Sequence, residues 1–177
     1  QATKEQILRV TKELFAQSRP EDVILFYFSG HGNADRFFVH DTDITSNAVQ
    51  TLFKEANAQR KLIFADACLS GSFRTSGSSS APPSGGHTDS RVLLFLSSRS
   101  DQNSRESSSL HNGAFTFFLI AGLKGGADAN QDRMITAKEL YDFVRPRVEE
   151  QTGGKQIPVM WGKFEDDMVI MNWKNNR

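Results

Sequence analysis

Two apolar runs in this sequence each end in a small-residue turn that carries one reactive side chain. Residues 23–28 (VILFYF) lead into Ser-Gly-His-Gly, which contains His31. Residues 61–65 (KLIFA) lead into Asp-Ala-Cys-Leu-Ser-Gly, which contains Cys68, the only cysteine of the chain. In an open parallel sheet, reactive groups collect beyond the carboxyl ends of the strands. If these two strands are neighbours, an imidazole and a thiol face one crevice, as in a cysteine nucleophile with its base.

Each of these residues also has a plainer interpretation. A single cysteine after a buried strand is usually a packing residue, and a single histidine is usually structural or solvated. The glycine-containing turns favour catalysis, because they let the backbone bend and approach a ligand closely. The backbone N–H groups of Gly32 and Cys68 could bind a developing oxyanion. We therefore predict a catalytic dyad of His31 and Cys68, with Gly32 and Cys68 forming the oxyanion site.

The composition indicates a single globular domain of 177 residues. Lys+Arg and Asp+Glu both total 21, so no net charge attracts nucleic acid or an anionic membrane. No apolar run approaches the ~20 residues of a membrane span, and the first residues lack a signal-peptide pattern. One cysteine cannot form an internal disulfide, and no zinc-type ligand spacing occurs. We expect a cytoplasmic protein with no metal in its site and no nucleic-acid or membrane partner.

Helical and strand patterns alternate along the chain. We expect helices at 4–17, 47–59, 113–123 and 136–151, a small hairpin around 37–39, and strands at 23–28, 61–65, 91–96 and 168–171. This alternation predicts an α/β fold with a mostly parallel sheet. Residues 72–90 consist almost wholly of Ser, Gly, Pro and Thr, and we expect them to form a flexible linker.

The two motifs around His31 and Cys68 resemble those of the caspase-like cysteine peptidases, especially bacterial caspase homologues and metacaspases. Residues 97–106 (SSRSDQNSRE) are similar to the substrate-binding strand and loop of a caspase small subunit, and residues 113–116 and 154–158 also fit that half. The resemblance covers nearly the whole chain. It implies a three-layer sandwich, with helices on both faces of a mostly parallel sheet. Residues 1–71 then form a large-subunit-like part, residues 72–90 the linker, and residues 91–177 a small-subunit-like part.

The resemblance also implies an activity, which is hydrolysis of peptide bonds in a peptide or protein substrate by the Cys68 thiolate, with His31 protonating the leaving amine. No cofactor is required for this reaction, and no aspartate is needed as a third member. Two rivals remain open. One is a catalytically silent caspase-like adaptor or binding module, and the other is an enzyme that hydrolyses a non-peptide acyl group with the same dyad.

Specificity is implied by the residues beside the dyad. In metacaspases, an acid and a serine at the positions of Asp66 and Ser29 line a pocket for Arg or Lys. Glu106 stands where a caspase has an aspartate-binding arginine, and Ser104 to Glu106 would hold the substrate main chain by strand addition. An acidic pocket binds a cation and rejects a carboxylate, so we expect cleavage after basic residues. The alternative for Asp66 is a carboxylate that merely orders its turn.

The linker itself is a candidate substrate. Arg74 and Arg91 bracket residues 72–90, and both would suit a protease that cleaves after basic residues. Caspase-like enzymes carry a linker between their large and small parts at this place, and our hypothesis is a zymogen that cleaves itself near one of these arginines. An exposed spacer with incidental arginines is the alternative.

Residues 128–139 (DANQDRMITAKE) nearly match a calcium-binding EF-hand loop, with oxygen ligands at the first, third, fifth, ninth and last places. Arg133 departs from the pattern, because it stands where the loop wants glycine for a sharp turn. The alternative is that Thr136 and Glu139 form a capping box for the last helix, while the acidic residues are ordinary turn residues. Both interpretations stay open at this point.

The start of the chain departs from the family pattern. Family members begin with a strand and a loop that come before the helix expected at 4–17, and no such segment precedes that helix here. We expect the chain to be a fragment or a processed product, with the missing N-terminal segment supplied as a partner. Without it, the strand that leads to His31 exposes an open edge.

Overall fold

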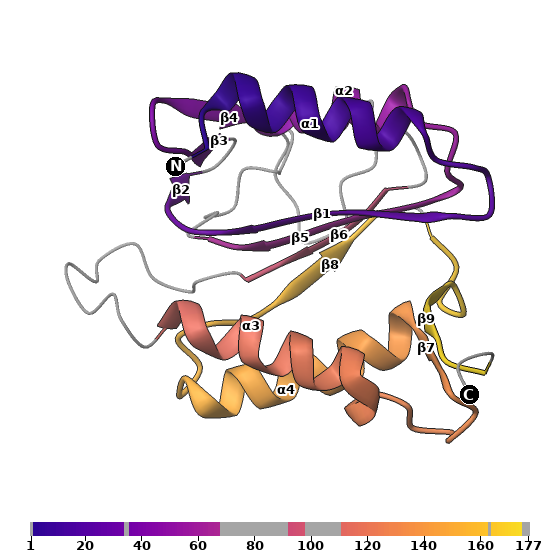
Figure 1. Ribbon diagram of the computed structural model, residues 1–177. Coiled ribbons are helices and arrows are strands. Elements are labelled where there is room, and N and C mark those ends of the chain that lie inside the picture. Colours follow the sequence, from indigo (N-terminus) through magenta and orange to yellow (C-terminus); the bar gives the residue numbers. More distant parts are fainter. Residues whose placement is uncertain (1, 34–35, 68–91, 98–110, 163, 175–177) are drawn as a thin grey trace.

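The computed structural model describes residues 2–33, 36–67, 92–97, 111–162 and 164–174 of the chain. These residues form three layers, with a central sheet between two pairs of helices (Figure 1). One layer holds α1 (Lys4–Ala16) and α2 (Ser46–Lys54), and the other holds α3 (His111–Ala121) and α4 (Ala137–Gln151). A short π-helical turn, η1 (Gly122–Gly126), continues α3. The predicted α/β sandwich is therefore confirmed.

The central sheet has the strand order β1 (Val23–Ser29), β5 (Arg60–Asp66), β6 (Val92–Leu96) and β8 (Val159–Trp161). The first three strands run parallel, and β8 pairs antiparallel with β6. The predicted sheet is thus mostly parallel, as expected. Sequence reasoning missed β8, because it has only three residues and none of them is fully buried.

Two small sheets lie outside the central one. The expected hairpin around 37–39 is part of a three-stranded sheet made of β2 (Gly32–Asn33), β3 (Arg36–Phe38) and β4 (Asp43–Thr45). The expected strand at 168–171 forms as β9 (Val169–Asn172), but it pairs with β7 (Met134–Thr136) rather than with the central sheet.

The prediction of a helix over 47–59 was wrong at its carboxyl end. The α2 helix begins after its N-cap Thr45 and ends at Lys54. Ala56 and Ala58 beyond it are buried in the core, and the Ala58 N–H donates to the Ser18 hydroxyl at 3.3 Å. The segment after Lys54 is therefore held by core packing and by Ser18, which is 40 positions away from Ala58 in the sequence. The apolar spacing along the sequence does not reveal such a contact.

Both faces of the central sheet are buried. On β5, Ile63 and Ala65 pack toward α1 and α2, while Leu62 and Phe64 pack toward α3 and α4. Alternate side chains of a strand point to opposite faces, so a strand covered on both sides is apolar throughout. This is why the run at 61–65 could be recognised as a strand from sequence alone.

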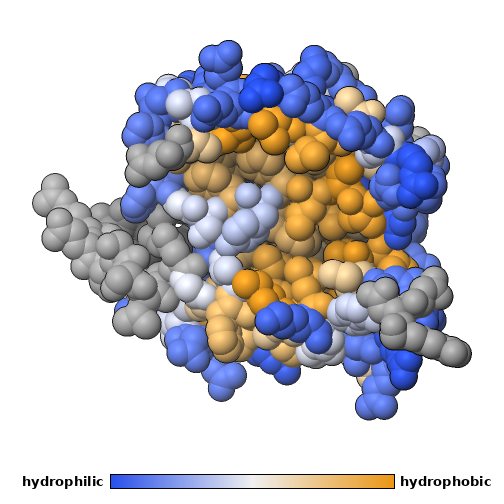
Figure 2. Space-filling view, in the orientation of Figure 1, coloured by the Kyte–Doolittle hydropathy of each residue, from blue (hydrophilic) through white to orange (hydrophobic). Residues whose placement is uncertain are grey.

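Strand β1 differs, because it lies at the edge of the sheet in the described part of the chain. Val23, Leu25 and Tyr27 are each between 36% and 44% exposed, and Phe117 and Ile120 of α3 are also exposed. Figure 2 shows hydrophobic residues gathered in a hollow between the two helical layers. That an additional N-terminal segment covers this edge stays a prediction. None of the described helices has the length and apolar content needed to cross a membrane.

The segment 128–139, which we call the Asp128 loop, folds back on its own backbone. The two carboxylate oxygens of Asp128 accept the N–H groups of Asp132 and Arg133, each at 3.0 Å. The capping box is confirmed, since the Thr136 hydroxyl accepts the Glu139 N–H at 3.2 Å and the Glu139 carboxylate accepts the Thr136 N–H at 3.0 Å. Thr136 is accordingly the N-cap of α4 rather than its first helical residue. Calcium binding by this loop stays a prediction.

The Asp128 loop contains a testable backbone strain. Arg133 has φ 64°, a left-handed conformation that costs a non-glycine residue about 1 kcal/mol or more. Arg133→Gly should therefore raise the free energy of unfolding by about 1 kcal/mol, measured by urea denaturation. Lys138→Gly, within α4, is the control and should lower the free energy of unfolding. A destabilised Arg133→Gly protein would contradict the strain argument.

A second prediction concerns the end of β8. Gly162 has φ 133°, and a Cβ placed there would lie 2.2 Å from the carbonyl oxygen of Val92. Gly162→Ala should lower the free energy of unfolding by about 2 kcal/mol or more, because a backbone atom must move. The matched control is Gly113→Ala in α3, where the new methyl group meets open space. That change should stabilise the helix by about 0.5–1 kcal/mol, and equal effects at both glycines would refute the prediction.

Candidate active site at the carboxyl edge of the sheet

The strands that lead to the two predicted catalytic residues are parallel neighbours. β1 and β5 pair over their whole length, from Val23 opposite Arg60 to Ser29 opposite Asp66. The Gly30 N–H then donates to the Asp66 carbonyl at 3.1 Å, so the two chains are still joined one residue beyond β1. In the sequence, His31 follows Ser29 by two residues and Cys68 follows Asp66 by two. The condition set by the sequence, that the two strands be adjacent, is met.

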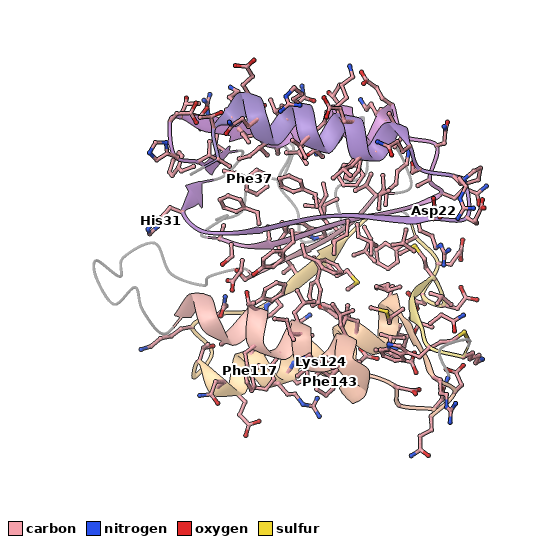
Figure 3. The ribbon with its side chains drawn as sticks, viewed as in Figure 1. Asp22, His31, Phe37, Phe117, Lys124 and Phe143 are labelled. Carbon is pink, nitrogen blue, oxygen red and sulfur yellow. The ribbon has the colours of Figure 1, made fainter. Side chains whose placement is uncertain are left out.

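His31 lies at the carboxyl end of β1 and is exposed. Figure 3 shows it at the opposite end of this strand from Asp22. Its carbonyl oxygen accepts the N–H of Phe38 at 2.9 Å, and the next residue, Gly32, pairs with Phe37. Phe37 is buried in the core below α1 and α2. The turn that carries His31 is therefore anchored by a small sheet whose central side chain is fixed in the core.

At the opposite end of β1, a compact turn leads into the strand. The Asp22 carboxylate accepts the backbone N–H of Arg19 at 2.8 Å and also bonds its guanidinium. The backbone hydrogen bond, followed by the guanidinium hydrogen bond, lowers the pKa of Asp22 below its usual value. This exposed pair lies far along the strand from His31 and takes no part in the candidate site.

Asp66 ends β5 and is fully buried. One carboxylate oxygen, Oδ1, accepts the Ser97 hydroxyl at 2.9 Å. The other, Oδ2, accepts both the hydroxyl of Thr116 at 2.6 Å and its backbone N–H at 3.3 Å. Hydrogen bonds of this kind offset the cost of burying a carboxylate. Asp66 therefore ties the carboxyl ends of β5 and β6 to helix α3.

Sequence reasoning did not single out Ser97 or Thr116. Ser97 had a usable signal, since it follows the apolar strand run directly, as Asp66 follows its own strand. Thr116 had a weaker one, because it is the polar residue in the otherwise apolar stretch 113–121. Neither signal could name Asp66 as the partner, because that contact joins residues 31 and 50 positions apart.

A further polar side chain lies beyond the carboxyl end of β6. In the antiparallel pairing of β6 with β8, Leu96 lies opposite Val159. Gln156 comes three residues before Val159, in the segment that leads into β8. The side chain of Gln156 is buried, and within the described structure neither its oxygen nor its nitrogen has a hydrogen-bond partner. Its backbone is held by Thr152, whose hydroxyl accepts the Gln156 N–H at 3.1 Å.

The remaining predicted site residues lie outside the described residues. These are Cys68, Ser104 and Glu106, together with the linker 72–90 and its flanking arginines Arg74 and Arg91. Ser29, the other predicted pocket residue, is described, and it is exposed at the last register position of β1. The structure thus brings Ser29, His31 and Asp66 to one edge, while contact between His31 and Cys68 stays a prediction. Over the described residues, no group of three or more His, Cys, Asp or Glu is arranged to hold a metal ion.

Comparison with solved structures supports the fold. The chain is similar to the crystal structure of caspase-1 from Spodoptera frugiperda, with a TM-score of 0.64 and 15% sequence identity, over 97% of this chain and 73% of that one. It is also similar to a protein from Geobacter sulfurreducens, with a TM-score of 0.57 and 16% identity, over 90% of this chain and 73% of that one. At these identities the likeness concerns the fold alone. No curated protein matches the chain.

The family comparison is more specific. The model of the caspase domain matches residues 1–169, which is nearly the whole chain and includes both of the motifs that carry His31 and Cys68. This match agrees with the three-layer sandwich and with the pairing of the two motif-bearing strands. The chain belongs to the caspase-domain family of cysteine peptidases.

Proposed function

We propose that this protein is a cysteine endopeptidase that uses His31 and Cys68 and cleaves after arginine or lysine. The observation that supports the dyad is the parallel register of β1 and β5, which ends with Ser29 opposite Asp66. Two strands in this register deliver the segments that follow them to the same edge of the sheet. Each of those segments carries its reactive residue two positions later.

In the proposed reaction, the Cys68 thiolate attacks the carbonyl carbon of the scissile peptide bond. The N–H groups of Gly32 and Cys68 stabilise the oxyanion that forms. The C–N bond then breaks as His31 gives its proton to the leaving amine, and a thioester remains on Cys68. Water then attacks the thioester carbonyl while His31 accepts a proton from it, and the C–S bond breaks to release the carboxylic acid and the Cys68 thiolate.

Specificity for a basic residue rests on Asp66 and Ser29. The Asp66 carboxylate is buried at the carboxyl edge of the sheet and held by Ser97 and Thr116. A cationic side chain would gain a charge-assisted interaction there, whereas a carboxylate would meet a like charge. In the alternative, Asp66 only orders its turn through the same hydrogen bonds, and the reporter peptides distinguish the two roles.

Reporter peptides test the proposed activity directly. Otherwise identical peptides ending in Arg, Lys, Asp or Gln before the fluorophore should be cleaved only when the residue is Arg or Lys. Cys68→Ala should abolish cleavage, and His31→Ala should lower kcat at least 100-fold, because general acid–base catalysis contributes about 10²–10⁴-fold. His40→Ala, in a surface turn of the same chain, is the matched control and should leave kcat unchanged.

Alkylation separates the protease from a silent module. An arginyl chloromethyl ketone should modify Cys68 faster than iodoacetamide does, because a peptidase site binds the arginyl group before the thiolate reacts. Equal rates with both reagents, together with no turnover of any reporter, would favour the adaptor alternative. Turnover of Asp-terminated reporters alone would refute the basic pocket and leave the dyad standing.

Self-processing is a separate prediction. The wild-type protein incubated alone should be cleaved after Arg74 or Arg91, while Cys68→Ala should stay intact, as judged by intact mass. Arg74→Gln and Arg91→Gln, made singly, identify the cleaved bond because each removes one basic residue. A Cys68→Ala protein clipped at the same bond as the wild type would show that another protease is responsible.

A further inference from the structure

A chain of hydrogen bonds runs from the exposed edge strand to the buried carboxylate of Asp66. The hydroxyls of Tyr27 and Thr116 lie 2.8 Å apart, and the Thr116 hydroxyl lies 2.6 Å from Asp66 Oδ2. The three residues belong to β1, α3 and β5. Tyr27 pairs with Phe64, two positions before the final register pair of Ser29 and Asp66.

Counting hydrogens shows which group donates and which accepts in each of these two hydrogen bonds. A threonine hydroxyl carries one hydrogen, and an ionised carboxylate can only accept. Thr116 must therefore donate its hydrogen to Asp66, which leaves its oxygen as the acceptor for the Tyr27 hydroxyl. The chain thus runs from the Tyr27 O–H through the Thr116 O–H to the carboxylate, and each link orients the next.

Thr116 contributes more to this arrangement than a single bond. Its backbone N–H donates to the same oxygen, Oδ2, at 3.3 Å, while Ser97 donates to Oδ1 at 2.9 Å. Helix α3 therefore donates two hydrogen bonds to one carboxylate oxygen, and Ser97, the residue after β6, donates one to the other. Contacts to both oxygens fix the plane of the carboxylate, and hydrogen bonds to an ionised group are stronger than neutral ones.

We infer that Thr116 is a positioning residue for substrate recognition, with Tyr27 orienting its hydroxyl. This inference rests on the proposed function, in which the Asp66 carboxylate receives a basic side chain. A recognition group held in one orientation before the substrate arrives does not lose that freedom on binding, so affinity rises. The effect belongs to binding of the basic side chain and not to the chemistry at Cys68.

Three variants test the inference. Thr116→Val removes the hydroxyl but keeps the side-chain shape and the backbone N–H, Thr116→Ser keeps the hydroxyl, and Tyr27→Phe removes only the first link. For an arginyl reporter, Thr116→Val should raise KM about 10-fold with kcat within twofold, since a charged-group hydrogen bond contributes about that factor. Thr116→Ser should stay within twofold of the wild type, and Tyr27→Phe should raise KM about threefold. Tyr141→Phe, which removes a tyrosine hydroxyl bonded to Arg145 on α4, is the matched control and should change neither parameter.

A second measurement does not depend on activity. Agmatine, which carries a guanidinium group, is titrated calorimetrically into the Cys68→Ala protein with and without Thr116→Val. Binding that weakens about 10-fold in the Thr116→Val protein, but not with Thr116→Ser, supports the positioning role even if no reporter is cleaved. That result would retain the inference while refuting the proposed protease.

Other outcomes overturn the inference. Unchanged KM in both Thr116→Val and Tyr27→Phe would do so, as would an equal loss of kcat for every reporter, which signals a merely structural role. If the wild type cleaves no reporter and binds no agmatine, Asp66 does not receive a cation and the positioning role is wrong. If Thr116→Val does not fold, as judged by circular dichroism, Tyr27→Phe decides, because its side chain is partly exposed on an edge strand.

Discussion

The parallel pairing of β1 with β5 is the constraint on which the candidate site depends. Seven register pairs join the strands, and a further hydrogen bond from Gly30 to the Asp66 carbonyl extends the contact beyond β1. Because the strands end together, Ser29 and Asp66, each two residues before a predicted catalytic residue, lie side by side at the carboxyl edge of the sheet. A slip of one residue would reverse the face of every side chain in one strand. In β1 it would move the buried Ile24 and Phe26 out of the core, so the packing of these two side chains opposes such a slip.

The hydrophobic core therefore positions the segments that carry the candidate site. Phe37 packs against Phe26 and Phe28, with ring centroids 6.0 and 4.8 Å apart, and so anchors the small sheet that follows His31. On the other face, Phe95 packs edge-on against Phe64 and Phe115, which brings α3 against β5 and β6. That contact positions the next residue of α3, Thr116, beside Asp66. Aromatic packing on both faces thus supports polar groups at one edge.

The edge strand β1 leaves apolar side chains exposed on one side of the molecule. Its outward apolar residues and those of α3 line the hollow seen in Figure 2, whereas β5 is covered on both faces. An open apolar edge is a template for pairing with another strand. Tyr27 lies on this edge and also begins the series of hydrogen bonds that leads through Thr116 to Asp66. A segment that paired with β1 would therefore lie close to these hydrogen bonds.

The sequence by itself determined the main strands and helices, the two small-residue turns and the caspase-like family. The strands, helices and turns follow from local spacing and composition, because a strand buried on both faces is apolar throughout and glycine marks a turn. The family follows from the resemblance of the two motifs around His31 and Cys68 to those of caspase-like peptidases. Only the tertiary structure decided that β1 lies beside β5, that α2 stops at Lys54, and that Ser97 and Thr116 hold Asp66. Those contacts join residues 31 to 50 positions apart, and no local pattern encodes a partner at that distance. They arise only when the sheet and helix α3 pack together.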